Sequence, residues 1–284
     1  MKPDRDVTNR QERREKWWHF AEKCPALYHA IDRGHAFARH PEGWSPIRTQ
    51  EPTVVAIARV SKSAAFIPVP NHYVFSEATV VLVVNGEYEL GVLQSNFHIG
   101  FAWQQASKLK NDLRYSPSDA LDPFPFPPET AYGPELAEAS VAYNERRLQL
   151  GLSLNLGVTD VLRLFNDATN DDLALLRLRN LHQKLDVAVR NAYGWSDIDL
   201  GHGFHTVPYL PESDRVRYTI SEPARLEILR RLSSLNRERW QAEQDEASAA
   251  LHDVEAARLA VQTPRRNSGP TLKLVPDPKQ PSLF

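Results

Sequence analysis

The sequence lacks the features on which disulfide-stabilised and membrane-spanning proteins depend. Among 284 residues there is a single cysteine, Cys24, so no disulfide can form within the chain. No apolar run is long enough to cross a bilayer, and residues 1–18 are charged rather than signal-like. We therefore expect a cytoplasmic protein that folds around a hydrophobic core, with Cys24 as a small buried side chain rather than a nucleophile.

Motifs of catalysis and of metal binding are missing as well. No glycine-rich turn of the kind that lets backbone donors approach a nucleotide or a methyl donor is present. GxSxG, HExxH and paired CxxC motifs are also absent. His202 and His205 stand three residues apart in Gly201–His205, and we interpret this stretch as a polar loop because no third ligand is near. The sequence thus predicts a binding protein without catalytic residues, metal or cofactor in this chain.

Hydrophobic periodicity predicts an α+β fold in which a β-rich part precedes a helical part. Apolar residues at three- and four-residue spacing predict a helical segment in residues 1–32. Short β-branched runs between 53 and 84 predict strands, and 87–106 is expected to pass from a buried strand into a helix. We expect a mixed, β-rich domain at 33–130, a helical, bundle-like domain at 131–260 and a disordered tail at 261–284.

Two polar stretches within the β-rich part are candidates for a nucleic-acid surface. The net charge of −2 argues against a uniformly basic protein, so any such surface has to be a local patch. The first stretch, 59–63, is expected at a hairpin tip, and the second, 98–116, carries Gln and Arg, which can bond to base edges, and Lys and Ser, which more often contact phosphates. The alternative interpretations are a solvated turn for 59–63 and a solvated helix end followed by a loop for 98–116. The candidate residues are Arg59, Ser61, Lys62, His72, His98, Gln105, Ser107, Lys108, Lys110, Arg114 and Ser116.

Several segments, in collinear order, carry a resemblance to a known family. They include RREKWWHFAEKCPALYHAI, VAIARVSKSAAFIPVPNHYVFSEA, LGVLQSNFHIGFAW and RYSPSDALDPFPFP, followed by LRNLHQKLDVAVRNAYGWSDIDLGHGFH and RYTISEPARLEILRRLSSLNRERW. With them the chain resembles the C-terminal portion of MmeI-like (type IIL) adenine-specific DNA methyltransferases and their relatives in DISARM phage-defence systems. The resemblance implies a target recognition domain over about 10–130, with helices packed behind it.

The resemblance also implies where the chemistry lies. The family's methyltransferase domain, with its S-adenosylmethionine loop and Asn-Pro-Pro-Tyr motif, would precede Met1. The segment DPFPFP at 122–127 does not reproduce that motif, because Phe interrupts the prolines and no Asn leads them. The expected function is therefore the sequence-specificity part of a split or truncated adenine-N6 methyltransferase of restriction–modification or phage defence. It would bind double-stranded DNA beside a methyltransferase-domain protein that supplies S-adenosylmethionine.

The C-terminus carries a short motif of its own. The C-terminal QPSLF is similar to the short motif by which bacterial proteins bind the replication sliding clamp, with Gln280, Leu283 and Phe284 as the contact residues.

The alternatives to DNA recognition are a helical assembly protein for which DNA is irrelevant, an inactive gene remnant, or an enzyme with an unrecognised site.

Overall fold

A computed structural model describes residues 53–262, except positions 72, 74, 85, 110 and 111, together with Leu27. It divides into two compact units, Met1–Asn236 and Arg237–Phe284. The expected helix in 1–32, Cys24 and the tail beyond 262 lie outside the described residues, apart from Leu27, which is helical. Within the described part, no helix combines the length and the apolar composition that a membrane crossing requires.

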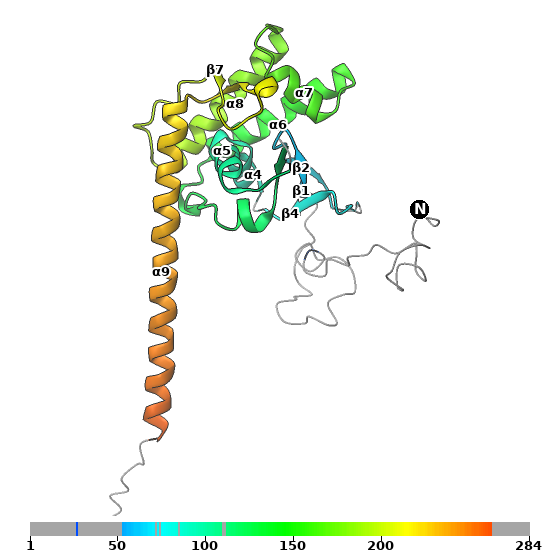
Figure 1. The fold of residues 1–284 in the computed structure, drawn as a ribbon. Coiled ribbons are helices and arrows are strands. Elements are labelled where there is room, and N and C mark those ends of the chain that lie inside the picture. The colour runs from blue at the N-terminus through cyan, green and yellow to red at the C-terminus, as the bar shows by residue number, and fades with distance from the viewer. Residues whose placement is uncertain are drawn as a thin grey trace, which may run out of the picture. The chain divides into compact units, whose positions relative to one another are not determined.

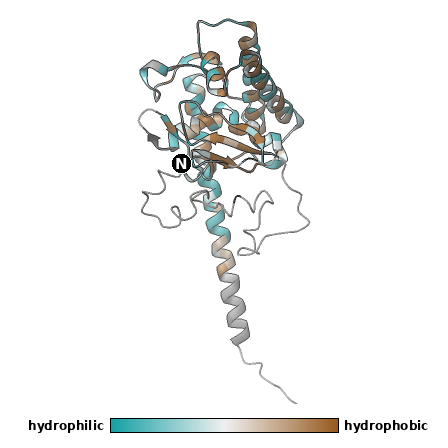
Figure 2. Cartoon of the chain, turned by 90° about the vertical axis from the view of Figure 1, so that its right-hand side faces the viewer, coloured by the Kyte–Doolittle hydropathy of each residue, from teal (hydrophilic) through white to brown (hydrophobic). Residues whose placement is uncertain are grey.

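The strands of the first unit form three small antiparallel sheets. The first sheet has the order β3-β1-β4, the second β2-β6-β5 and the third β7-β8. Their bounds are β1 Thr53–Ala58, β2 Val60–Ser61, β3 Ile67–Pro70, β4 Thr79–Leu82, β5 Lys108–Leu109, β6 Asp112–Arg114, β7 Gly203–Thr206 and β8 Val216–Thr219. The β-branched runs predicted as strands therefore are strands, and Figure 2 shows arrows coloured brown, as hydrophobic, in the described part of the chain.

Helices make up most of the remaining described chain (Figure 1). Their bounds are α4 Gly86–Gln94, α5 Asn96–Gln105, α6 Pro134–Leu154, α7 Val158–Phe165, α8 Leu173–Ala192 and α9 Glu222–Gln262. Short turns of π or 3-10 type occupy Pro117–Leu121, Glu129–Ala131 and Glu212–Asp214. The α+β class expected from the sequence is thus confirmed.

Helix boundaries follow local capping chemistry. Pro134 opens α6, where its missing N–H costs no hydrogen bond, and Asn155 ends that helix in the left-handed conformation with φ of 54°. The Asp172 carboxylate accepts a hydrogen bond of 2.6 Å from the Ala174 amide at the start of α8. Ser221 accepts from the Ala224 amide at 3.4 Å in the first turn of α9. Asp172 and Ser221 therefore cap the first turns of α8 and α9.

The strand expected near the start of 87–106 is wrong. The structure has two helices there, α4 and α5, and every residue from Leu90 to His98 is buried. A helix that is buried on all sides shows no polar stripe, so its sequence cannot be distinguished by periodicity from that of a buried strand.

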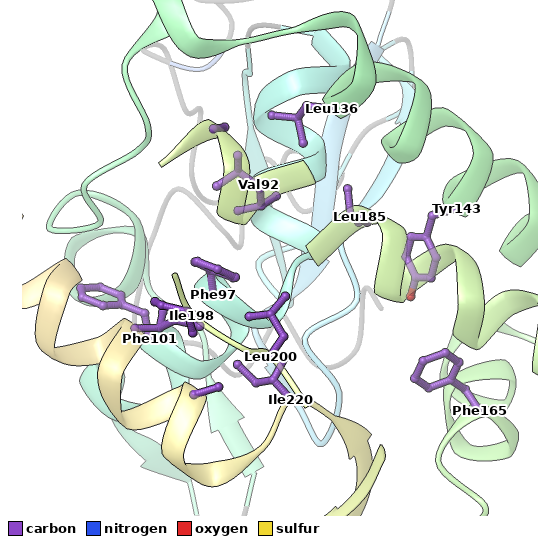
Figure 3. Close-up of a cluster of buried hydrophobic side chains, with 14 of the residues drawn as sticks. Val92, Phe97, Phe101, Leu136, Tyr143, Phe165, Leu185, Ile198, Leu200 and Ile220 are labelled. Atoms are coloured by element: carbon purple, nitrogen blue, oxygen red, sulfur yellow. The ribbon is translucent and has the colours of Figure 1, made fainter. Parts of the chain in front are cut away.

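Helices α4 and α5 join two hydrophobic cores. Leu90, Leu93 and Trp103 pack with the strands in one core. Val92, Phe97 and Phe101 pack with α6, α8 and the start of α9 in the other, together with Leu136, Leu185 and Ile228 (Figure 3). The β-rich and helical parts therefore share the same pair of central helices. The expected boundary at 130/131 remains a prediction.

Candidate nucleic-acid interface

The sheet β2-β6-β5 brings the two polar stretches of the sequence together. Val60 lies opposite Arg114, and Ser61 lies opposite Leu113. The Arg114 amide also donates a hydrogen bond of 3.0 Å to the carbonyl oxygen of Ser107. The two stretches are therefore neighbours in the fold.

Arg114 is turned outward by the alternation of side chains along β6. Leu113 and Tyr115, on either side of it, are each 1% exposed and belong to the core around the sheets. Successive side chains of a strand point to opposite faces, so burial of these two fixes the Arg114 side chain on the outer face. Val60, its partner across the sheet, is exposed on the same face.

Arg59 lies in the connection between the antiparallel strands β1 and β3, where the chain passes from the first sheet into the second. Its amide donates to the carbonyl of Ala78 at 2.8 Å, in the turn before β4. The chain then enters β2 of the second sheet instead of turning back directly along β1. Arg59 and Arg114 are both exposed, and neither side chain has an ion-pair partner among the described residues. Both guanidinium groups are therefore available to an anion.

Lys62 extends this surface toward the third sheet. Its Nζ lies 3.1 Å from Asp214 Oδ2, and its side chain is 59% exposed. Asp214 Oδ1 also lies 3.7 Å from Arg217 Nη2. Sequence reasoning missed Asp214 and Arg217, because no local pattern reveals an ion pair between residues about 150 positions apart. An exposed pair of this kind is weak, so Lys62 can exchange Asp214 for another anion at little cost.

The serines and the glutamine of the candidate set occupy turns and helix ends. Ser61 Oγ donates to the Ser63 carbonyl at 2.8 Å and accepts from the Ser63 amide at 3.1 Å, which closes the turn after β2. Ser116 Oγ lies 2.8 Å from Ser118 Oγ. Gln105 and Ser107 are exposed at the end of α5 and just beyond it. Ser107 directly precedes β5, and Ser116 follows β6 by two residues.

His98 lies in the interior and not on this surface. The side chain is fully buried, its Nε2 lies 3.0 Å from the Tyr115 hydroxyl, and its ring packs edge-on against Phe124 at 4.5 Å. Burial lowers the pKa of His98 from 6.5 to about 3. The expectation that His98 faces outward rested on treating α5 as a surface helix. We therefore leave His98 out of the interface proposed below.

Other candidate residues are not described. His72, Lys110, Gln280, Leu283 and Phe284 lie outside the described residues, and for Lys108 only the backbone is described, opposite Leu113 in the sheet.

The interpretation of Gly201–His205 as a loop is wrong for its second half, because Gly203–Thr206 form strand β7. The two histidines of this stretch bind separate partners. His202 Nε2 donates to the buried Asp186 carboxylate at 2.8 Å, whereas His205 Nε2 donates to the Gly201 carbonyl at 2.8 Å. Burial by itself raises the pKa of Asp186, but the neighbouring His182 and the hydrogen bond from His202 outweigh it and lower that pKa. In the described part of the chain, no group of three or more His, Cys, Asp or Glu side chains is arranged to hold a metal ion.

Comparison with known proteins identifies the region that contains this surface. Residues 22–128 match the family model described as MmeI, target recognition domain. No curated protein matches the chain. Among solved structures, it is similar to the type IIL restriction-modification enzyme MmeI in complex with DNA, at 22% sequence identity and a TM-score of 0.48, over 71% of this chain and 24% of that one. The chain thus spans about a quarter of the length of that enzyme. The resemblance to the target recognition region of MmeI-like proteins is confirmed over residues 22–128 by the family match.

Proposed function

We propose that this chain is the DNA sequence-recognition part of an adenine-N6 methyltransferase system of restriction–modification or phage defence. The observation that carries the proposal is the sheet β2-β6-β5, which lies inside the segment that matches a target recognition domain and places the two polar stretches on neighbouring strands. Double-stranded DNA is the proposed ligand of this surface.

The side chains on this surface suit both kinds of contact that DNA recognition needs. A guanidinium bonds bidentately to guanine and a glutamine amide to adenine, while lysine and serine more often hold phosphates. Arg59 and Arg114 carry exposed guanidinium groups that pair with no carboxylate among the described residues, and Gln105 is an exposed amide at the end of α5. We assign these three residues to base or phosphate contacts, and Lys62, Ser107 and Ser116 to the backbone of the duplex.

Catalysis is assigned to a separate chain. The 284 residues contain neither a glycine-rich loop for S-adenosylmethionine nor an Asn-Pro-Pro-Tyr motif. A partner with a methyltransferase domain would bind the methyl donor and flip the target adenine out of the stack, while this chain holds the flanking bases.

An assay with labelled S-adenosylmethionine tests whether methyl transfer requires a separate chain. The chain alone, incubated with duplex DNA, should transfer no methyl group to DNA, and transfer should appear when a methyltransferase-domain protein from a neighbouring reading frame is added. Transfer by the purified chain without any partner contradicts the assignment.

Fluorescence anisotropy with labelled duplexes tests the DNA contact itself. Affinity should fall as salt rises, because phosphate contacts release counterions, and it should differ between duplexes of different sequence. Absence of binding at 50 mM salt contradicts the proposal.

The C-terminal residues form a second proposed binding site, for the replication sliding clamp. We assign Gln280, Leu283 and Phe284 to binding of the replication sliding clamp, because QPSLF combines a glutamine with two apolar anchors. A chain that lacks residues 280–284 should lose capture by immobilised clamp and keep its affinity for duplex DNA. Equal capture of both chains contradicts this assignment.

Helix α9 favours an assembly function as the alternative. Trp240 and Leu251 are 57% and 71% exposed on this helix. Self-association of the full chain, measured by sedimentation, together with no affinity for any duplex would favour assembly over DNA recognition.

A further inference from the structure

The sheet β3-β1-β4, two strands of which are labelled in Figure 1, has two apolar faces. In its register Val55 lies opposite Leu82. Both belong to the core that also contains residues of α4 and α5, as do Ile57 and Val80. Successive side chains of a strand point to opposite faces, so the residues between these four form a second face. The second face consists of Val54, Ala56, Ile67, Val69 and Val81, with Val83 just beyond β4.

The second face is continuous across the three strands. Val54 lies opposite Val69. Ala56 lies opposite Ile67 on one side and opposite Val81 on the other. An antiparallel sheet with one face in water alternates apolar and polar residues, and no member of the second face is polar. The pattern therefore indicates a sheet that is covered on both faces.

The described residues cover the second face only in part. None of its members belongs to either hydrophobic core of the described chain, although Val54 is only 1% exposed. Val83 is 38% exposed, whereas its neighbour Val84 packs against the core below the first face. The half-buried members are Ala56, Ile67, Val69 and Val81. An apolar face of this kind gains free energy when a further apolar surface covers it.

The residues ahead of Thr53 contain a matching apolar stripe. Between positions 17 and 31, apolar residues recur at three- and four-residue spacing, as in a helix with one buried face. Pro25 interrupts this segment, but it can open a second helix. Leu27, the one described residue of the segment, is helical. The stripe consists of Trp17, Phe20, Ala21, Cys24, Leu27, Tyr28 and Ile31.

The dimensions of the stripe and of the second face agree. A helix over 17–31 would be about 22 Å long and about 10 Å wide. The six residues of β1 extend over about 20 Å. The outer strands of a three-stranded sheet lie about 10 Å apart. One helix therefore suffices to cover the sheet.

The same segment is tethered to the second face. The chain enters the sheet at Thr53, and the next residue, Val54, already belongs to the second face. Residues 32–52 connect the stripe to this strand and can span up to about 70 Å when extended. A tether of this kind gives the segment an effective concentration on the order of millimolar at its own sheet. The tether favours this segment over a second copy of the chain.

We propose that residues 17–31 form an amphipathic helical segment that docks on the second face of the sheet β3-β1-β4 in the same chain. Its stripe would cover Val54, Val69 and Val81. The sheet would then lie between α4 and α5 on one side and this segment on the other. The inference does not rest on DNA recognition.

Alkylation of Cys24 in the full chain tests the docking, because Cys24 is the only thiol among the 284 residues. It lies in the middle of the stripe, so docking should slow its reaction with iodoacetamide by about tenfold or more relative to the chain unfolded in guanidinium. Val83→Lys places a charge on the most accessible part of the second face and should speed the reaction by about tenfold. The matched control is Val216→Lys, at a position that is 50% exposed on β8, and it should leave the rate unchanged.

Cysteine cross-linking in the full chain locates the contact. Val69→Cys and Val81→Cys each add one thiol on the second face. Leu173→Cys adds one on α8, at a position that is 70% exposed, and serves as the control. A short bis-maleimide should cross-link Cys24 within one chain about tenfold faster in the first two variants than in the third. Thermal unfolding checks that each variant is folded, and if Val83→Lys is not, the cross-linking variants decide.

The outcomes distinguish this occupant from others. Cys24 that reacts as fast in the folded chain as in guanidinium overturns the inference, and so does equal cross-linking in all three cysteine variants. Cross-links that form mainly between chains and increase with protein concentration assign the second face to another copy, which also overturns it. Loss of duplex binding affects none of these measurements, so failure of the proposed function is recognised separately.

Discussion

The amide of Tyr115 donates a hydrogen bond of 2.8 Å to the carbonyl oxygen of Arg59. This bond ties residues 56 positions apart in sequence and holds the exposed Arg59 beside the strand that presents Arg114. Two stretches that are individually ordinary polar segments thereby become neighbours, and the first two predictions below depend on this arrangement.

Arg114→Ala should weaken duplex binding. The loss is expected to be about 1–3 kcal/mol for the preferred sequence if the guanidinium reads a base. If it contacts a phosphate, the loss should be uniform across sequences and the salt slope should fall by about one unit. Arg163→Ala serves as the matched control, because Arg163 is 72% exposed on α7 and pairs only locally with Asp160. Equal affinities for wild type and Arg114→Ala would remove Arg114 from the interface.

Asp214→Asn should strengthen binding to any duplex, because it frees Lys62 and Arg217 from their shared carboxylate. The gain is expected to be at most about fivefold, since an exposed ion pair contributes about 1 kcal/mol or less. Anisotropy titrations at two salt concentrations measure it. The gain should vanish when Lys62→Ala is added, and a gain that persists in this double variant would assign the effect to another group.

His98 should make the protein less stable as pH falls below neutrality. Its folded-state pKa of about 3 lies below the ordinary value of 6.5, so the unfolded chain binds the proton first. Stability should therefore fall by up to about 1.4 kcal/mol per pH unit as pH drops from about 6 toward 4.5. His98→Gln, which retains a partner for the Tyr115 hydroxyl, should flatten this dependence in urea titrations, whereas His205→Gln should not. An equally steep dependence in His98→Gln is incompatible with a neutral buried His98.

Phe124→Ala should cost about 3–5 kcal/mol of the free energy of unfolding. Phe124 is 4% exposed and packs edge-on against both His98 and Phe101, at 4.5 and 5.3 Å. The control Leu148→Ala, at a position that is 64% exposed on α6, should change stability by about 0.5 kcal/mol or less. Urea denaturation compares the two, and similar small losses would show that the 122–127 segment is not anchored through Phe124.

Secondary structure could be predicted from the sequence where interactions between neighbouring residues decide it. The β-branched runs at 53–58 and 79–82 became strands, and the caps at Asp172 and Ser221 start helices, because propensity and capping act over a few residues. The sequence did not allow prediction of residues whose environment is set by distant parts of the chain. His98, a candidate interface residue from the sequence, is buried because α4 and α5 lie between two cores.

The candidate surface likewise combines features that local sequence predicts with contacts between distant parts of the chain. Alternation along 112–115 suffices to turn Arg114 outward once Leu113 is known to be buried, but the pairing of that strand with Val60 is a long-range contact. The link from Lys62 to Asp214 is of the same kind. Only the packed fold brings these groups together.

Selection from a randomised pool of duplexes tests the central claim most directly. The wild-type chain, incubated with the pool at physiological salt, should enrich one short sequence motif over successive rounds, and Arg59→Ala or Arg114→Ala should relax the preference at particular positions of it. A pool that remains random after selection with the wild-type chain contradicts a function in DNA sequence recognition.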